Sequence, residues 1–226
     1  MNKIAVIVAG GTGSRMGFAL PKQFIEINER PIMVHTLSAF LESYADMQII
    51  LVLPKAHEEK GRELVKQYFG HAAVSVTTGG STRFYSVQNG LQLINETSVI
   101  FVHDAVRCMV TKDLISRCFD TALKEGNAVP AVMARDSIRI ISENRSEVID
   151  RTLVRIVQTP QTFRSEILLP AFKQPYHESF TDEATVVEKS GVKIHLIEGE
   201  ETNFKITIPN DLYIAEKILG SRLKTN

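Results

Sequence analysis

The stretch Val6-Ile7-Val8-Ala9-Gly10-Gly11-Thr12-Gly13-Ser14-Arg15-Met16, with Pro21-Lys22-Gln23 shortly after it, decides the fold class of this 226-residue chain. An apolar run that ends in a glycine-rich turn is typical of a buried strand leading into a loop of an α/β sheet. The glycines permit positive φ and let backbone N–H groups approach an anion, while Arg15 and Lys22 supply positive charge. The stretch therefore predicts a polyphosphate-binding loop.

The two commonest glycine loops do not match this one. A Walker A loop requires Gly-Lys-Ser/Thr, which the sequence lacks. The dinucleotide fingerprint could start at Gly11, but Met16 stands at its third glycine position, and Leu53-Pro54-Lys55 replaces the acidic end of the second strand. The alternative is an ordinary strand–helix turn in which the glycines have no ligand role. Because Arg15 and Lys22 follow the glycines so closely, we favour the phosphate-binding interpretation.

Composition excludes several classes of protein. Lys plus Arg and Asp plus Glu number 26 each, which argues against a nucleic-acid or polybasic membrane surface. Cys108 and Cys118 have no C-x-x-C spacing, so we expect neither a disulfide framework nor a zinc site. No apolar run approaches the ~20 residues of a membrane span, and the start of the sequence lacks the features of a signal peptide. We expect a cytoplasmic protein with no membrane or nucleic-acid partner.

Alternating strand and helix patterns predict an α/β sheet. A polar turn is expected over residues 158–163, and a helix from Pro209 closes the chain. Strands are expected over residues 3–9, 48–53, 73–77, 98–103, 128–134 and 192–197, with helices after Pro31, over 56–69, after Thr82, from Thr111 to near Gly126, to about Phe172, and from Thr181 or Asp182.

Residues 135–152 break this pattern. Two alternating runs, 136–141 and 147–151, flank turn residues and predict an inserted β-hairpin. Because a two-stranded ribbon is marginally stable alone, it should pack on something. A partner subunit is the expected partner of this protruding arm.

Two further segments carry candidate ligand groups. Thr78-Gly79-Gly80-Ser81-Thr82-Arg83 is either a second place where backbone approaches a ligand or a plain helix cap. Asp104 and Arg107 follow a buried strand, at the edge where open α/β sheets bind ligands, and either contact a ligand or pair with each other. We interpret His103 as a hydrogen-bonded core or rim residue rather than a catalytic base.

Lys205 lies between Phe204 and Ile206 in a short run, 202–207, that is expected to be extended. If that run is a half-buried strand, its two apolar side chains face the core and Lys205 faces the open side. The sequence thus predicts a third cation near the glycine loop.

These motifs carry a family resemblance. The glycine loop with Pro21-Lys22-Gln23 resembles the signature of the sugar-phosphate nucleotidyltransferase superfamily. The later motifs resemble, in order and over nearly the whole chain, those of the 2-C-methyl-D-erythritol 4-phosphate cytidylyltransferase family of the non-mevalonate isoprenoid pathway. They are Gly79-Gly80-x-x-Arg83-x-x-Ser86-Val87, Val102-His103-Asp104-Ala105-x-Arg107, Gln158-Thr159-Pro160-Gln161, Thr181-Asp182-Glu183-Ala184 and Asn203-Phe204-Lys205-Ile206-Thr207.

The resemblance implies a Rossmann-like three-layer nucleotidyltransferase fold, a mostly parallel mixed sheet flanked by helices, as a single domain over residues 1–226. It implies that CTP and 2-C-methyl-D-erythritol 4-phosphate give 4-diphosphocytidyl-2-C-methyl-D-erythritol and pyrophosphate, with Mg²⁺ on the triphosphate. The substrate phosphate attacks the α-phosphorus in line, a reaction that needs positioning and charge neutralisation more than a protein base. It also implies a homodimer whose arms, residues 135–152, cross between subunits.

The same resemblance assigns roles to individual residues. The implied catalytic residues are Arg15, Lys22 and Lys205. The implied nucleotide-binding residues are Ala9, Gly10, Gly11, Thr12, Gly13, Gly80, Ser81, Ser86 and Asp104, with Asp104 also the candidate metal ligand. The implied substrate-binding residues are Arg107, Ser137, Arg151, Thr159 and Thr181, of which Ser137 and Arg151 would serve the neighbouring subunit's site.

Two rival functions follow from the same motifs. A ribitol-5-phosphate cytidylyltransferase shares nearly all of them, but the short segment 17–20 and the arm residues Ser137 and Arg151 favour the erythritol substrate. A non-catalytic relative would have lost a cation of the loop or Lys205, and none is lost. The chain departs from the family pattern at Cys108, where Pro is common, at Ser81, where an acidic residue is frequent, and at Ser137, where Thr is common.

Overall fold

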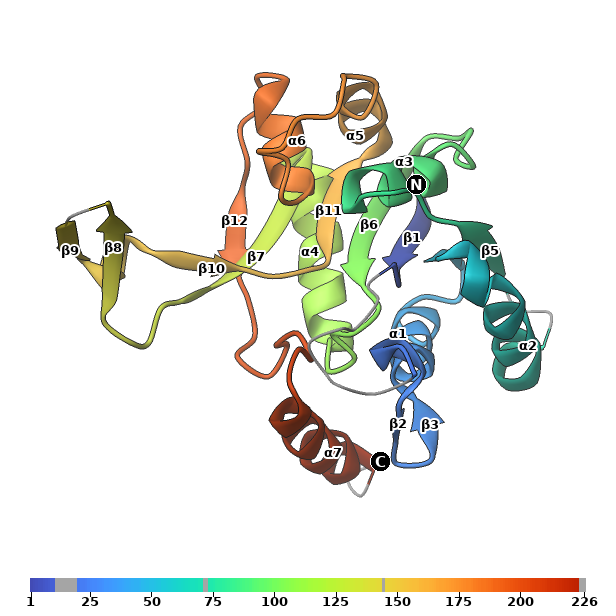
Figure 1. Ribbon diagram of the computed structural model, residues 1–226. Coiled ribbons are helices and arrows are strands. Elements are labelled where there is room, and N and C mark those ends of the chain that lie inside the picture. The colour runs from blue at the N-terminus through green and yellow to red at the C-terminus, as the bar shows by residue number, and fades with distance from the viewer. Residues whose placement is uncertain (11–19, 71–72, 144, 224–226) are drawn as a thin grey trace.

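A mixed β-sheet forms the centre of the molecule in the computed structural model, which describes residues 1–10, 20–70, 73–143 and 145–223 (Figure 1). The strand order is β10-β7-β11-β6-β1-β4-β5, and β12 also pairs with β7. The strands are β1 (Asn2–Val8), β4 (Met47–Leu53), β5 (Val74–Thr78), β6 (Ser98–Asp104), β7 (Asn127–Met133), β10 (Arg155–Val157), β11 (Gln161–Arg164) and β12 (Leu196–Glu198), with a small hairpin of β2 (Glu26–Ile27) and β3 (Arg30–Pro31) outside the sheet.

The parallel half of the sheet creates the place where a ligand is expected. Strands β5, β4, β1 and β6 are all parallel, and the chain builds β1, β4 and β5 outward before returning to add β6 on the other side of β1. Ligands of open α/β sheets bind beyond the carboxyl ends of the strands at such a reversal. Val8 is paired with Asp104, so the glycine loop and the Asp104 loop leave the sheet side by side.

Helices cover both faces of the sheet, which explains why β1 is apolar at nearly every position. Alternate residues of β1 pack into two different cores. The helices are α1 (Ile32–Leu41), α2 (Glu58–Phe69) and α4 (Lys112–Glu125) on one face, α3 (Arg83–Leu91), α5 (Ser165–Ala171) and α6 (Glu183–Lys189) on the other, and α7 (Pro209–Leu223), which packs on the β2–β3 hairpin. The expected three-layer Rossmann-like fold is confirmed.

Helix ends follow the local sequence. Thr111 accepts a hydrogen bond from the Leu114 N–H and begins α4, and Gly126, with φ of 91°, ends it. Asp182 begins α6 with a full capping box that involves Thr185. Each such cap is worth about 1 kcal/mol, so short helices such as α6 start at a defined residue.

The arm is a separate two-stranded sheet of β8 (Ile138–Ser142) and β9 (Arg145–Ile149), as the hairpin pattern predicts. It projects from the body at the end of β7, away from the edge at β5 (Figure 1). Within the described ranges, no helix combines the length and apolarity needed to cross a membrane.

Three segments differ from expectation. Residues 158–163 are not all turn, because β11 begins at Gln161 and runs antiparallel between β6 and β7. Gln161 and Thr162 are polar but buried, so this central strand lacks the apolar pattern by which a buried strand is predicted from sequence. In place of the strand expected over 192–197, the structure has only the short β12. Residues 203–207 form no strand, because they make single hydrogen bonds to loops and not the repeated backbone pairing of a sheet.

Candidate active site

The carboxyl end of β1 presents Ala9 and Gly10 at the reversal in strand order. The Ala9 N–H donates to the Val52 carbonyl at 2.9 Å, and its carbonyl accepts from Gln23 Nε2 at 2.8 Å. Gln23 is buried, so the Pro-Lys-Gln motif anchors the far side of the loop to the strand end. The predicted loop residues Gly11, Thr12, Gly13 and Arg15 lie outside the residues that the structure describes.

Gly79 and Gly80 face Gly10 across the Ser86 side chain. A Cβ on Gly79 would lie 2.9 Å from Ser86 Oγ, and one on Gly80 would lie 2.3 Å from the Tyr85 Cβ. Ser86 Oγ accepts from the Gly80 N–H at 3.1 Å and donates to the Thr82 carbonyl at 2.9 Å. The helix-cap interpretation of this segment is confirmed, because Thr82 caps α3, and the approach of its glycine backbone to a ligand stays a prediction.

Asp104, at the end of β6, lies among three cations. Its Oδ2 is 2.9 Å from Lys205 Nζ and 3.6 Å from Arg107 Nε, and its Oδ1 is 3.3 Å from Arg83 Nη2. Burial alone would raise the pKa of Asp104, but the charges of Arg83, Lys205 and Arg107 hold that pKa below its ordinary value. The carboxylate is ionised whenever the fold is intact near neutral pH.

His103 is buried and hydrogen-bonded, in agreement with the core position that was one of the two expected. Its Nε2 can only donate to the Arg107 carbonyl, at 3.2 Å, so Nδ1 accepts from the Thr159 hydroxyl at 3.0 Å. Burial lowers the pKa of His103 to about 3. Thr159 Oγ1 in turn accepts from the Asp104 N–H at 3.2 Å, so this predicted substrate residue holds the strand end beneath the carboxylate.

Lys205 reaches the site from an irregular segment that is fastened on both sides. Asn203 Nδ2 donates to the Thr159 carbonyl at 2.8 Å, and the Asn203 carbonyl accepts from Arg107 Nη1 at 2.9 Å. The Ile206 N–H donates to the Val106 carbonyl at 3.0 Å. Ile206 is buried and Lys205 is exposed and contacts Asp104, so the lysine faces away from the core as expected, although the segment forms no strand.

Lys22 is hydrogen-bonded to the segment that carries Lys205. Its Nζ donates to the Ile206 carbonyl at 3.0 Å, one residue beyond Lys205. A lysine 184 positions earlier in the chain is thereby held beside the Lys205 segment. The structure brings together Lys22, Lys205 and Asp104, which sequence motifs far apart predicted separately.

Other predicted residues lie elsewhere or make other contacts. Ser81 and Thr181 are exposed, at the starts of the segments that lead into α3 and α6. Ser137 and Arg151 are exposed at the two ends of the arm, where Arg151 Nη1 donates to the Arg135 carbonyl at 2.7 Å. The Asp104–Arg107 ion pair, which the sequence left as an alternative, is present.

Sequence reasoning missed the part played by Arg83 and Glu183. Both stand inside quoted motifs, yet neither was assigned a role. Glu183 is 1% exposed and makes a two-fold ion pair with Arg83, whose guanidinium also contacts Asp104. The sequence signal that could have been noticed is Glu183 itself, a carboxylate directly after the capping Asp182. In the structure this position is buried.

The cysteines are structural, as we expected. Cys108 and Cys118 are buried and unpaired, and burial raises the pKa of each thiol to about 12. Cys108 packs with Met109 and Ile206 in the core beneath the Lys205 segment. Neither thiol is available as a nucleophile.

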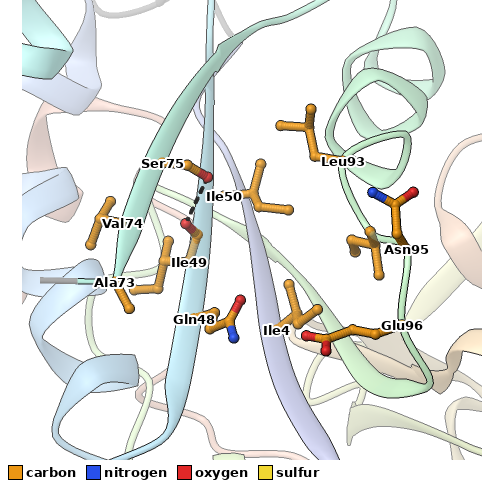
Figure 2. Close-up of a pocket in the computed structure, with 11 residues that line it drawn as sticks. Ile4, Gln48, Ile49, Ile50, Ala73, Val74, Ser75, Leu93, Asn95 and Glu96 are labelled. Atoms are coloured by element: carbon orange, nitrogen blue, oxygen red, sulfur yellow. Dashed lines mark hydrogen bonds between the residues drawn. The ribbon is translucent and has the colours of Figure 1, made fainter.

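A separate pocket of about 540 Å³ opens at the amino ends of the strands (Figure 2). Ile4, Ile50 and Leu93 line its wall, and Gln48 and Glu96 lie at its polar side. It contains one carboxylate and no cation among its lining residues. It lies at the opposite end of β1 from Ala9, so it plays no part in the candidate site.

The residues that the structure describes contain no group of three or more His, Cys, Asp or Glu that could hold a metal by themselves. What they do contain is a concentration of positive charge around one carboxylate, next to backbone from two glycine segments. Such an arrangement neutralises and orients a polyphosphate. The Thr159 hydroxyl does donate to His103 Nδ1, but both side chains are buried, so this pair is not presented to a ligand.

Comparisons with known proteins agree with this geometry. The family model described as 2-C-methyl-D-erythritol 4-phosphate cytidylyltransferase matches residues 3–221. A relative with that name from Bacteroides fragilis is 42% identical over 219 residues, spanning 97% of this chain and 100% of the relative. Another from Porphyromonas gingivalis is 42% identical over 220 residues, spanning 97% and 98%.

Solved structures give the same result. The crystal structure of the Francisella tularensis 2-C-methyl-D-erythritol 4-phosphate cytidylyltransferase superposes with a TM-score of 0.81 at 29% identity, covering 96% of this chain and 100% of that one. The family model's match, over residues 3–221, spans the sheet, both helical layers and the C-terminal segment that carries Lys205. The chain belongs to the 2-C-methyl-D-erythritol 4-phosphate cytidylyltransferase family.

Proposed function

We propose that the chain transfers a cytidylyl group from CTP to 2-C-methyl-D-erythritol 4-phosphate, giving 4-diphosphocytidyl-2-C-methyl-D-erythritol and pyrophosphate. Family membership supports this reaction. The observation that carries the assignment to this site is the contact of Lys205 with Asp104 at the reversal in strand order, with Lys22 alongside. Two lysines and a buried carboxylate meet there at the end of β6.

The residues would act by position and charge. A phosphate nucleophile is already anionic at pH 7, so the site must draw two anions together and neutralise the charge that builds up at the α-phosphorus. We assign that task to Lys22 and Lys205, with Arg15 as the third cation. The Lys205 side chain is 42% exposed, so its ammonium can turn from Asp104 to an incoming phosphate.

The remaining assignments follow the family pattern. Gly80, Ser81 and Ser86 would bind the cytosine, and the backbone of residues 9–13 would line the nucleotide. The close packing of Gly79 and Gly80 on α3 supports a base pocket made largely of backbone. Arg107, Thr159 and Thr181 would face the polyol phosphate, directly or by holding the groups that do.

Mg²⁺ fits this site in one way. Mg²⁺ is commonly held by one or two carboxylates together with substrate phosphates and water. Asp104 supplies one ionised carboxylate, and both its oxygens have cationic partners in the structure. We propose that Asp104 contributes at most one ligand and the triphosphate the others, so that the bound metal adds to the neutralisation of phosphate charge.

The test of the reaction is pyrophosphate release with CTP and either 2-C-methyl-D-erythritol 4-phosphate or ribitol 5-phosphate, with ATP, GTP and UTP as controls. We expect turnover with CTP and the erythritol substrate. Lys205→Ala should lower kcat by about 10²-fold or more, as when one transition-state donor is removed. Lys217→Ala, an exposed lysine of α7, is the matched control. Unchanged kcat in Lys205→Ala would overturn its role, and preference for ribitol 5-phosphate would overturn the substrate.

We further propose a homodimer joined through the arm, residues 135–152. Several large apolar side chains of the arm and its base are exposed together, and exposed apolar patches of this kind mark interaction surfaces. These are Ile140, Ile141, Val148, Leu153 and Ile156, exposed by 54%, 74%, 67%, 80% and 53%. Ser137 and Arg151 would then complete the site of the other subunit.

A mixing experiment tests the shared site. Arg151→Ala and Lys205→Ala are each expected to be nearly inactive. In a 1:1 mixture, a mixed dimer of a two-fold symmetric enzyme has one site with both defects and one with neither, so about a quarter of wild-type activity returns. No recovery would refute the shared site, as would a fully active monomer in sedimentation equilibrium.

We also propose a single nucleotidyltransferase domain over residues 1–226 and a cytoplasmic location, where CTP is available. Helices on both faces of one sheet support the single domain. Limited proteolysis that cuts only near the arm, and cell fractionation, test these two proposals.

A further inference from the structure

Arg83 connects the site to the rest of the molecule through two carboxylates. Its guanidinium makes a two-fold ion pair with Glu183, in which Nη2 lies 3.1 Å from Oε2, and its Nε and Nη2 lie 3.4 and 3.3 Å from Asp104 Oδ1. The arginine comes from α3, the aspartate from β6 and the glutamate from α6. One side chain thus bridges three elements directly beside Lys205.

Glu183 gives this bridge a fixed end. Its carboxylate is 1% exposed, and among the described residues Arg83 is its ion-pair partner. The start of α6 is itself tied to the sheet, since Gln161 Oε1 accepts from the Ala184 N–H and Gln161 Nε2 donates to Asp182 Oδ2, both at 2.8 Å. Arg83 therefore has little freedom to follow Asp104 if that residue turns.

The bridge divides the two oxygens of Asp104 between two partners. Oδ1 faces Arg83 and Oδ2 faces Lys205. The carboxylate can rotate about χ2, and a half-turn only exchanges its two equivalent oxygens, so the tilt of its plane is what the partners must fix. Arg83, fixed by Glu183, holds one oxygen while Lys205 contacts the other, and together the two contacts set that tilt.

We propose that Arg83 is a positioning residue, held by Glu183, that orients Asp104 so that the carboxylate presents Lys205 to the phosphates. Asp104 has a second support in its backbone, whose N–H is held by Thr159. The inference rests on the proposed function, because it concerns the placement of the lysine that the proposed reaction uses. Buried ion pairs add little net stability, which favours a role of this kind over a purely structural one.

The decisive variant removes both charges of the pair together, that of the buried Glu183 and that of the partly buried Arg83. Arg83→Met/Glu183→Leu replaces the pair with apolar side chains of similar size, a change that is often neutral or stabilising. Glu183→Leu alone would leave the charge of Arg83 without its Glu183 partner. Arg164→Met/Glu166→Leu is the matched control, since it removes an exposed arginine–glutamate pair.

We expect the double variant to fold and to lower kcat about 10- to 100-fold, with KM for CTP within about threefold of wild type, because misplacement by about 1 Å costs about that much. Arg83→Lys keeps the charge but lacks the planar fork that pairs two-fold with Glu183 while also reaching Asp104, so it should show the same loss. Wild-type kcat in either folded variant overturns the proposal and leaves Arg83 a structural residue.

A crystal structure of the double variant decides the question without activity. We expect the distance from Lys205 Nζ to Asp104 Oδ2 to lengthen from 2.9 Å, or the carboxylate to turn. An unchanged Asp104–Lys205 geometry overturns the inference. If the wild-type enzyme releases no pyrophosphate, the proposed function fails, and this structural readout still tests the role of Arg83.

Discussion

Replacing His103 should remove part of the acid sensitivity of the fold. The folded protein holds the imidazole neutral between the Thr159 hydroxyl and the Arg107 carbonyl, and burial lowers its pKa from 6.5 to about 3. The unfolded chain binds a proton there at pH 5, whereas the folded chain does not. Because the folded pKa is the lower one, the stabilisation is present above pH 6.5 and is lost as the pH falls below it.

The magnitude follows from the two pKa values. Between pH 7 and pH 5, His103 should lower the free energy of unfolding by about 2 kcal/mol. This figure barely changes if the folded pKa lies anywhere below about 4, because at pH 5 the folded imidazole is then still almost wholly neutral. The expected effect is therefore well above the error of a denaturation experiment.

Urea unfolding followed by far-UV circular dichroism measures it, since the chain has no tryptophan. His103→Gln should be less stable at pH 7 because two buried hydrogen bonds change, yet it should lose about 2 kcal/mol less than wild type on going to pH 5. His177→Gln, which replaces an exposed histidine, is the control. Equal losses for wild type and His103→Gln would refute the assignment of a neutral buried imidazole.

Three further outcomes are expected. Gly90→Ala should destabilise the fold by about 1–3 kcal/mol in thermal melts, because its Cβ would lie 2.8 Å from Val6 Cγ1; equal or higher stability would contradict that packing. Asp182→Ala should cost about 1 kcal/mol through the lost capping box at α6, measured by urea unfolding. Cys108 and Cys118 should react with a thiol reagent only after denaturation, because burial raises the pKa of both to about 12, and rapid labelling of the native protein would refute this.

The sequence by itself predicted the sheet strands that are apolar throughout and the helices with clear caps. β1 is apolar at nearly every position because both of its faces are buried. Thr111 and Gly126 mark the ends of α4 because capping and positive φ depend on those residues alone. The ordered motifs predicted the family, which the comparisons confirm, whereas the polyphosphate expected at the glycine loop stays a prediction. The arm was also visible, because alternation with turn residues is a local signal.

Only the tertiary structure decided how the site is assembled. β11 escaped pattern reading because it carries the buried polar residues Gln161 and Thr162, and the hydrogen bonds of Gln161 to the start of α6 leave no mark in the periodicity of the sequence. The segment of Lys205 is fixed by hydrogen bonds to residues about 40 to 100 positions away, which no local propensity encodes. The sequence predicted the cations, but Asp104 acquires its partners only where β6 and α3 meet the Lys205 segment, because charge interactions depend on distance in space and not on spacing along the chain.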